Sequence, residues 1–231
     1  MASDESRHSK AESASLVDDE EERARLEARN ALSQFDLVLK IINDFVTTPE
    51  RVFRLRPSMI QNLHREALNG LSRFAGNWRP AGVEIGQSMH KPPGVHLVAA
   101  LVEEMCDYVN ENWSAKTPIH LASYVMWRLN WIHPFDDGNG RTSRAVSYLV
   151  LCVRSGMLLP GRNTIPEQIA ANKEPYYQAL EVADEADRKG GLDVSKLEAL
   201  MSDYLAAQLL DVFNSATRQG SDSEPHVPKL H

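Results

Sequence analysis

The chain has 231 residues, of which 42% are hydrophobic and 25% charged, the proportions of an ordinary soluble globular domain. This length is enough for one substantial domain with its own core. No apolar run is long enough to span a bilayer, and the polar N-terminus does not read as a secretory signal peptide. With only two cysteines, Cys106 and Cys152, a disulfide framework is not expected. We therefore expect a cytoplasmic protein with no membrane partner.

The net charge of −7 is concentrated at one end of the chain. Residues 1–22 contain eight acidic and two basic side chains, so the rest of the chain is close to neutral. A near-neutral body argues against general affinity for nucleic acid, and we expect no nucleic-acid partner. It remains compatible with a local basic pocket that binds phosphates.

Composition divides the chain into four parts. Residues 1–17 are polar and rich in serine, and we expect a disordered acidic tail because they cannot bury enough apolar surface to offset chain entropy. Residues 18–50 predict an N-terminal helix whose acidic first turn favours the helix dipole. Residues 51–217 form the expected core domain, and residues 218–231 a flexible tail.

Apolar spacing predicts a mainly α fold. The segment 119–131 is apolar nearly all round, which indicates a buried central helix. The segment 76–94 is rich in proline and glycine, and the alternation of Val83-Glu84-Ile85 within it predicts a short β-hairpin. Further helices are expected at 57–71, 96–109, 141–155, 166–171, 175–187 and 192–217.

Residues 133–144 carry the pattern with the clearest chemistry and read His-Pro-Phe-Asp-Asp-Gly-Asn-Gly-Arg-Thr-Ser-Arg. Gly138 and Gly140 bracket Asn139 just before a predicted helix, and glycine permits close approach of the backbone to a ligand. Free N–H groups at a helix N-terminus, with the positive end of the helix dipole, form an anion site. The pattern therefore predicts binding of a negatively charged group.

Charged residues in the same segment narrow the chemistry. Arg141 and Arg144 are three residues apart and project from one face of the first turn, so their guanidinium groups suit a polyphosphate. Asp137 is a typical anchor for Mg²⁺, which takes few protein ligands beside phosphates. His133 has an unperturbed pKa suited to proton abstraction near neutral pH. Together they fit phosphoryl or nucleotidyl transfer to a hydroxyl.

The segment matches the Fic signature H-P-F-x-[DE]-G-N-G-R-x-x-R at every fixed position, so a chance match is negligible. Its surroundings are similar to the family as well. Residues 58–71 resemble the helix that opens the Fic core, residues 75–85 the segment leading to the flap, and residues 173–180 the helix after the active site. The chain therefore resembles the Fic family over residues 26–209, which implies a Fic-type helical bundle with a small β-hairpin flap.

The resemblance implies transfer of AMP from ATP to a Ser, Thr or Tyr hydroxyl of a target protein, with the chain itself among the candidate targets. His133 would deprotonate the hydroxyl, and attack on the α-phosphorus would expel pyrophosphate. Asp137 would hold Mg²⁺ between the α- and β-phosphates. The implied cofactor is thus Mg²⁺, and the implied partners are ATP and a protein with an exposed hydroxyl.

The resemblance also assigns roles around the triphosphate. Gly138, Asn139 and Gly140 would cradle phosphates through backbone and amide groups. Arg141 and Arg144 would neutralise the β- and γ-phosphates.

Beyond the triphosphate, the resemblance assigns a support, a flap and a base contact. Phe135 would pack beneath the loop and fix its position. Tyr176 and Tyr177 are equally compatible with contact to the nucleotide base and with core packing. The flap would clamp the target segment by strand addition. Its expected residues are Val83, Glu84, Ile85 and Gly86.

Several residues near the motif have simpler interpretations. His64, His96 and His120 are expected to be structural, and His90, in the flap region, is left undecided. Asp136 occupies the variable motif position and is expected to be solvated. Trp127 and Trp131 are expected in the core, and Thr142 and Ser143 in the first turn of a helix.

Many Fic proteins carry an inhibitory helix with the pattern [ST]-x-x-x-E-[GN], which this sequence does not match. The nearest candidate is Glu27, with Arg23 in place of Ser or Thr and Ala28 in place of Gly or Asn. We hypothesise that Glu27 pairs with Arg144; the alternative is a surface glutamate on an amphipathic helix. A separate antitoxin or self-association could supply inhibition instead.

Other functions remain open at this stage. A close variant would use another nucleotide or also remove AMP, whereas the Doc-like kinase branch is disfavoured because Gly140 keeps the transferase form of the motif. A non-enzymatic regulator is disfavoured by the intact motif. A DNA-binding regulator is disfavoured because about a dozen residues after the last helix are too few for a winged-helix extension.

Overall fold

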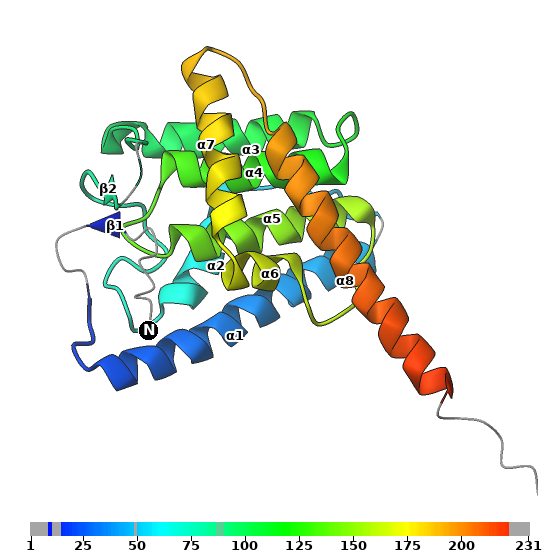
Figure 1. Cartoon of the computed structure of the whole chain (residues 1–231). Coiled ribbons are helices and arrows are strands. Elements are labelled where there is room, and N and C mark those ends of the chain that lie inside the picture. The colour runs from blue at the N-terminus through cyan, green and yellow to red at the C-terminus, as the bar shows by residue number, and fades with distance from the viewer. Residues whose placement is uncertain (1–8, 11–14, 49, 87, 89, 222–231) are drawn as a thin grey trace, which may run out of the picture.

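The computed structural model describes residues 9–10, 15–48, 50–86, 88 and 90–221. Within these residues it forms eight α-helices, one 3₁₀ helix and a two-stranded sheet (Figure 1), which confirms the mainly α prediction. The α-helices are α1 (Glu20–Val46), α2 (Pro57–Leu68), α3 (Val98–Glu111), α4 (Pro118–Ile132), α5 (Asn139–Ser155), α6 (Ile165–Ala171), α7 (Glu174–Arg188) and α8 (Ser195–Ser221). The remaining elements are β1 (Ser9–Lys10), β2 (Glu84–Ile85) and the 3₁₀ helix η1 (Val95–Leu97).

The long helix α1 begins where the sequence predicts. Asp19 is its N-cap, and the carboxylate accepts a hydrogen bond from the backbone N–H of Glu22 at 2.7 Å. Its buried residues recur every fourth position, so α1 packs one stripe onto α2 and α5. These buried residues are Asn30, Gln34, Val38 and Ile42. Two of them are polar, and both donate to carbonyl groups of α2 or its C-terminal turn.

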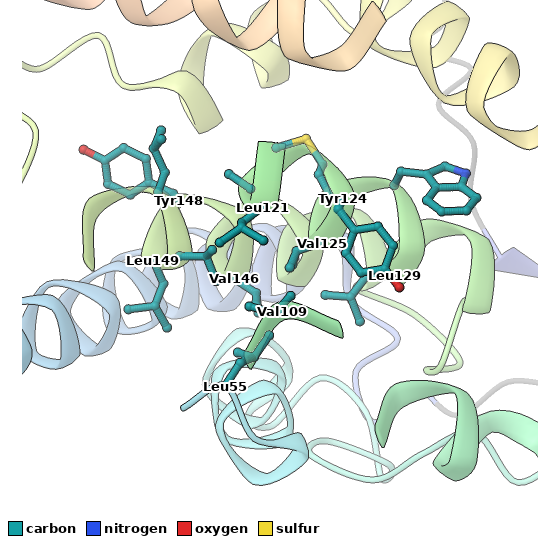
Figure 2. Packing of buried hydrophobic residues seen from close by; sticks show 14 of the residues in the cluster. Leu55, Val109, Leu121, Tyr124, Val125, Leu129, Val146, Tyr148 and Leu149 are labelled. Carbon is teal, nitrogen blue, oxygen red and sulfur yellow. The ribbon is translucent and has the colours of Figure 1, made fainter. Parts of the chain in front are cut away.

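Helices α4 and α5 form the centre of the molecule (Figure 2), as the nearly uniform apolar character of residues 119–131 predicts. Every residue from Leu121 to Leu129 is buried. The two helices lie along each other, and the hydroxyl of Ser147 donates to the carbonyl of Ala122 at 2.8 Å. The site loop connects these two helices, so it is held at both ends by the core.

The other helices enclose this pair. Helix α3 packs on α4, while α7 and α8 pack on each other and on α4 (Figure 1). Helix α6 is short, but Thr164 and Glu167 form a capping box at its start. Helix α7 carries Tyr176 and Tyr177 in its first turn, where the hydroxyl of Tyr176 contacts Nδ2 of Asn130 on α4.

The strand expected near Val83 is present, but its partner differs from the prediction. Instead of a hairpin within the flap, β2 pairs with β1, and the register is antiparallel with Ser9 opposite Ile85 and Lys10 opposite Glu84 (Figure 1). Residues of the flap at 87 and 89 lie outside the described residues. The alternation of side chains identified a strand, but strand pairing depends on a segment more than 70 residues away, which the local pattern does not reveal.

The two predicted tails also differ in part from expectation. Ser9–Lys10 form a strand, and Ser15 forms a bridge with Ser72, whereas residues 1–8 and 11–14 lie outside the described residues. Helix α8 continues to Ser221, four residues beyond the predicted end of the core, and residues 222–231 are not described. A regular backbone therefore extends further at both ends than composition alone indicates.

Two further features concern the cysteines and the helices of the described residues. Cys106 and Cys152 are both free and buried. Among the described helices, none combines the length and apolar character needed to cross a bilayer.

Truncation of Leu149 in α5 tests the central packing. Its side chain is fully buried, so we expect Leu149→Ala to lower the free energy of unfolding by about 2–5 kcal/mol. Leu210→Ala is the matched control, because Leu210 is 57% exposed on α8 and its loss should cost under about 0.5 kcal/mol. Urea unfolding measures both. Equal destabilisation by the two variants would contradict the α4–α5 core.

Candidate functional site

The candidate base sits at the end of the central helix. His133 caps α4 in the left-handed conformation, with φ 50° and ψ 58°, and among the described residues it is the sole non-glycine with positive φ. A left-handed residue other than glycine carries backbone strain and often marks a functional position. The turn directs the chain out of the core and into the loop that leads to α5.

The ring of His133 is 6% exposed and has a defined orientation. Nδ1 lies 3.3 Å from the carbonyl oxygen of Asn130, and a carbonyl can only accept, so Nδ1 carries the proton and Nε2 is the basic nitrogen. Burial, followed by the positive charges of Arg79 and His90, lowers the pKa of His133 to about 4, although the Asn130 bond opposes this. The imidazole is therefore neutral at physiological pH.

The loop after His133 is fixed from inside by its own residues. The side-chain amide of Asn139 accepts from the N–H of Phe135 at 3.0 Å and donates to the carbonyl of Phe135 at 2.9 Å. Asn139 is 4% exposed, so its amide closes the loop rather than facing a ligand. Only its backbone N–H remains for the phosphate cradle implied by the resemblance. Phe135 is fully buried beneath the loop, as expected.

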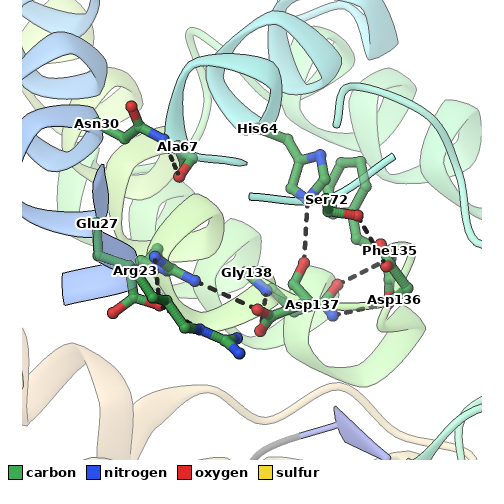
Figure 3. A network of polar contacts seen from close by, with 12 residues as sticks. Arg23, Glu27, Asn30, His64, Ala67, Ser72, Phe135, Asp136, Asp137 and Gly138 are labelled. Carbon is green, nitrogen blue, oxygen red and sulfur yellow. Dashed lines mark hydrogen bonds and ion pairs between the residues drawn. The ribbon is translucent and has the colours of Figure 1, made fainter. Parts of the chain in front are cut away.

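His64 of α2 supports the same loop (Figure 3). Its ring stacks on Phe135 with a centroid distance of 3.6 Å and an angle of 5°. Nδ1 accepts from the N–H of Gly76 at 2.9 Å, and Nε2 donates to the carbonyl of Asp137 at 3.0 Å. Burial lowers the pKa of His64 to about 4, so the ring is neutral and both nitrogens are satisfied. This agrees with the structural interpretation of His64 and adds that its task is to hold the site loop.

Arg79 is a site residue that the sequence analysis did not identify. Its guanidinium is 2% exposed and donates from Nε to the carbonyl of His133 at 2.8 Å, from Nη1 to that of Ala81 at 2.9 Å, and from Nη2 to that of Pro93. Its backbone N–H donates to Pro134. One buried side chain thus ties both ends of the flap to the candidate base. All but one of its partners lie 14 or more residues away, so no local signal marks it.

The N-terminus of α5 presents unused backbone donors. In the described part of the chain, the N–H groups of Asn139, Gly140 and Arg141 have no acceptor, and the first bond of the helix runs from Thr142 to Gly138. Gly138 has φ 74°, and a Cβ there would collide with Leu68. These donors lie at the positive end of the helix dipole, where the sequence argument expects an anion to bind.

The two motif arginines have different surroundings. Arg144 is half-buried; desolvation lowers its pKa, and it makes no ion pair with any residue that the structure describes. Arg141 is 27% exposed, and its Nη2 lies 3.5 Å from Oδ2 of Asp137. A desolvated guanidinium without a carboxylate partner favours an anionic ligand. Arg144 is therefore the cation best prepared for phosphate.

Glu27 reaches the motif, but not at the arginine that we hypothesised. Its Oε1 lies 4.0 Å from Nη1 of Arg141 and 3.5 Å from Nε of Arg23 (Figure 3). The expected pair with Arg144 is thus replaced by a pair with Arg141. Arg144 also lines a hollow with residues of α1, but it lies near Tyr176 and Tyr177, and the carboxylate of Glu27 meets Arg141 instead.

A hollow in front of His133 is lined by residues from four segments of the chain. Its lining includes His133, Gly140 and Arg144, together with the two tyrosines of α7 and Ile85 of the flap. Tyr177 is partly exposed there, while Tyr176 is 1% exposed. The hydroxyl of Tyr176 accepts from Nδ2 of Asn130 at 2.7 Å, and this amide also contacts Ser143. Tyr176 is thus part of the packed wall, and Tyr177 is the more accessible of the two.

Three other expectations can be compared with the structure. We expected Asp136 to be solvated, and this is wrong: it is 4% exposed, accepts from the hydroxyl of Ser72 at 3.1 Å, and has its pKa raised by burial. His90, left undecided, donates from Nε2 to the carbonyl of Trp131 at 2.7 Å and lines the hollow. Trp127 is a core residue, as predicted, and also donates to Asp184 of α7.

The metal expectation rests on one carboxylate. Asp137 is 37% exposed and stands beside the unused N–H groups of α5. Within the described residues, no group of three or more His, Cys, Asp or Glu side chains could hold a metal ion by itself. A single partly exposed carboxylate fits Mg²⁺, which keeps several waters and binds with substrate phosphates.

Comparison with known proteins agrees with this geometry. Residues 54–151 match the Fic/DOC family. The protein adenylyltransferase Fic of Drosophila willistoni is 31% identical over 164 residues, and that of Drosophila persimilis is 32% identical over the same length. In both cases the match covers 70% of this chain and 30% of the relative. The chain thus spans less than a third of the length of these relatives.

Solved structures show the same fold. Fic-1 from C. elegans superposes with a TM-score of 0.65 at 23% identity, covering 87% of this chain and 55% of the other. A Fic family protein from Desulfovibrio desulfuricans G20 gives a TM-score of 0.57 at 22% identity, covering 83% of this chain and 67% of the other. At these identities the likeness establishes the fold alone.

The two buried histidines predict how stability depends on pH. The pKa of His64 is about 4 in the folded chain against an ordinary 6.5, so the unfolded chain binds the proton more readily. The free energy of unfolding should fall as the pH drops from about 6.5 to 4, by roughly 3 kcal/mol for each such histidine. Urea unfolding at pH 7, 6 and 5 measures this slope.

His64→Gln should flatten the slope, because the titrating group is gone. His96→Gln is the matched control, since His96 is exposed in η1 and the substitution should leave the slope unchanged. An unaltered slope in His64→Gln would show that His64 is not a source of the pH dependence.

Proposed function

Because the chain belongs to the Fic/DOC family, we propose that it transfers AMP from ATP to a hydroxyl side chain of a protein. The observation that carries this proposal is the convergence of a neutral histidine and an arginine without an ion pair to any described residue on one hollow at the N-terminus of α5. The names of the relatives, protein adenylyltransferases, support the same reaction.

His133 would act as the general base. Its Nδ1–H is engaged by Asn130, so Nε2 is the nitrogen that can accept a proton from the incoming hydroxyl. Burial keeps the ring neutral, which leaves it ready to accept that proton. The hydroxyl oxygen would then bond to the α-phosphorus while the bond to the leaving pyrophosphate breaks.

The start of α5 would bind the triphosphate. The N–H groups of Asn139, Gly140 and Arg141 point out of the first turn, and Arg144 adds a desolvated positive charge. Together they would stabilise the charge that develops on the leaving pyrophosphate. Gly140 lacks a side chain, and a Cβ there would come within 3.3 Å of Nη1 of Arg144, so glycine leaves room for that guanidinium.

Asp137 would hold Mg²⁺, as a single carboxylate at the edge of the phosphate site. When bound, the ion would neutralise phosphate charge and polarise the phosphate oxygens. Asp137 now contacts Arg141 at 3.5 Å, so this pair would loosen when the nucleotide binds.

The remaining assignments concern the adenine base of ATP, the target protein and the cellular compartment. Tyr177 would contact the adenine base of ATP, and Tyr176 would form the wall behind it. Strand β2 and the neighbouring Val83 and Gly86 would dock the target segment. Two buried free cysteines, Cys106 and Cys152, suit a reducing compartment such as the cytoplasm.

Transfer assays with ATP labelled at the α- or the γ-phosphate test the reaction. Label should pass to protein from the α position only; transfer from the γ position would identify a kinase and contradict the proposal. His133→Ala should abolish transfer and leave ATP binding intact. The control His96→Ala changes an exposed histidine and should retain transfer.

The role of Arg144 has a separate test. Arg144→Ala removes one charged contact, so we expect ATP binding to weaken by about 1.5–3 kcal/mol, which is roughly a 10- to 150-fold higher Kd. Arg162→Ala, at an exposed arginine, is the control and should bind ATP normally. Calorimetric titration measures both, and equal affinities would remove Arg144 from the phosphate site.

We also propose that Glu27 restrains the site through Arg141. This pair is half-exposed, so Glu27→Gln should raise ATP affinity and self-modification by no more than about fivefold. Glu21→Gln is the matched control, because Glu21 pairs with Arg25 four residues away on α1, as Glu27 does with Arg23, but has no partner in the motif among the described residues. If Glu27→Gln behaves like this control, inhibition would have to come from an antitoxin or a second copy of the chain.

A further inference from the structure

The edge of the flap strand already has a partner in this structure. Strand β1 pairs antiparallel with β2 and places Ser9 opposite Ile85 and Lys10 opposite Glu84 (Figure 1). Ser9 and Lys10 therefore occupy the strand edge of the flap.

A second contact holds the same segment further along. The N–H of Leu16 donates to the carbonyl of Leu71 at 3.0 Å, and Ser15 forms an antiparallel bridge with Ser72. Ser72 in turn bonds to Asp136 of the site loop. The segment is thus attached to the core at two places, one on the flap and one beside the loop that carries His133.

The flap edge adjoins the reaction centre. Ile85, the register partner of Ser9, lines the hollow that also contains His133 and Arg144. A segment added to β2 as a strand therefore passes the mouth of this hollow. Strand addition to an exposed edge is a common way to bind an extended peptide, because backbone hydrogen bonds supply the affinity.

We propose that this N-terminal segment is an acceptor for the enzyme's own reaction and that Ser9 is the hydroxyl modified. The inference rests on the proposed AMP transfer and names its first substrate. Residues 1–17 contain no Thr or Tyr, so serine supplies every side-chain hydroxyl there. The hydroxyl of Ser15 already donates to the carbonyl of Val17 at 2.9 Å. Of the two residues that pair with β2, Ser9 and Lys10, Ser9 is the one with a hydroxyl.

The chemical step is balanced with the groups named. The Ser9 hydroxyl gives its proton to His133, and its oxygen forms a bond to the α-phosphorus of ATP. The bond from that phosphorus to the bridging oxygen breaks, and pyrophosphate leaves with the electron pair. The product is a phosphodiester between Ser9 and AMP, and His133 passes its proton to solvent.

Modification within one chain has a kinetic signature. A tethered acceptor is present at an effective concentration set by the linker, independent of the amount of protein in solution. The first-order rate constant for self-modification should therefore stay the same when the concentration of the chain changes tenfold. A reaction between two chains would instead accelerate in proportion.

The experiment incubates the full chain with Mg²⁺ and α-labelled ATP and maps the adduct by mass spectrometry after cleavage at acidic residues. We expect AMP on the peptide that contains Ser9. Ser9→Ala should reduce the amount of label on the chain at least tenfold, whereas the control Ser3→Ala should leave it unchanged. Lys10→Pro retains the Ser9 hydroxyl but disrupts the strand, so it should also lose label, while Ala2→Pro should not.

The outcomes separate this inference from the proposed function. Label on another residue, label that survives Ser9→Ala, or a rate proportional to chain concentration would overturn the inference and leave AMP transfer standing. No protein-bound label on the chain or on added lysate proteins, and no pyrophosphate release, would count against both.

Discussion

The site depends on the buried guanidinium of Arg79. It donates to the carbonyl of His133 and to those of Ala81 and Pro93, so the base and the two ends of the flap share one support. A charge with so little exposure is tolerated only because its donors meet acceptors. Since these acceptors are backbone groups, the guanidinium fixes the path of the chain, and with it the distance between the flap edge and the ring of His133.

This support also affects the chemistry of His133. The positive charge of Arg79 opposes a second positive charge on the imidazole, and burial acts in the same direction. The left-handed turn at His133 removes the ring from the helical stripe of α4, while Asn130 fixes which nitrogen carries the proton. Asn130 also contacts Ser143 and Tyr176, so the orientation of the base and the wall of the hollow are set by one amide.

Local patterns in the sequence predicted what depends on local physics. Helical periodicity and capping residues located α1 to α8 to within a few residues, and the glycine-rich motif coincides with the backbone N–H groups left without acceptors at the start of α5. Arg79, the paired strand β1 and the burial of Asp136 were missed because each depends on partners distant in the chain. Glu27 was placed on the correct helix but beside the wrong arginine, since the rotation of α1 over α5 is a property of packing.

The contacts that bear on regulation come from outside the segment that matches the family, residues 54–151. Glu27 of α1 lies beside Arg141, and Ser9–Lys10 lie on the flap strand. Helix α1 is anchored by Asn30 and Gln34, which donate to carbonyl groups of α2 and of the turn that follows it. Since α2 also carries His64 beneath the site loop, movement of the N-terminal helix would reach the motif through packed groups. The residues before the core are thus positioned to influence both the start of α5 and the flap strand.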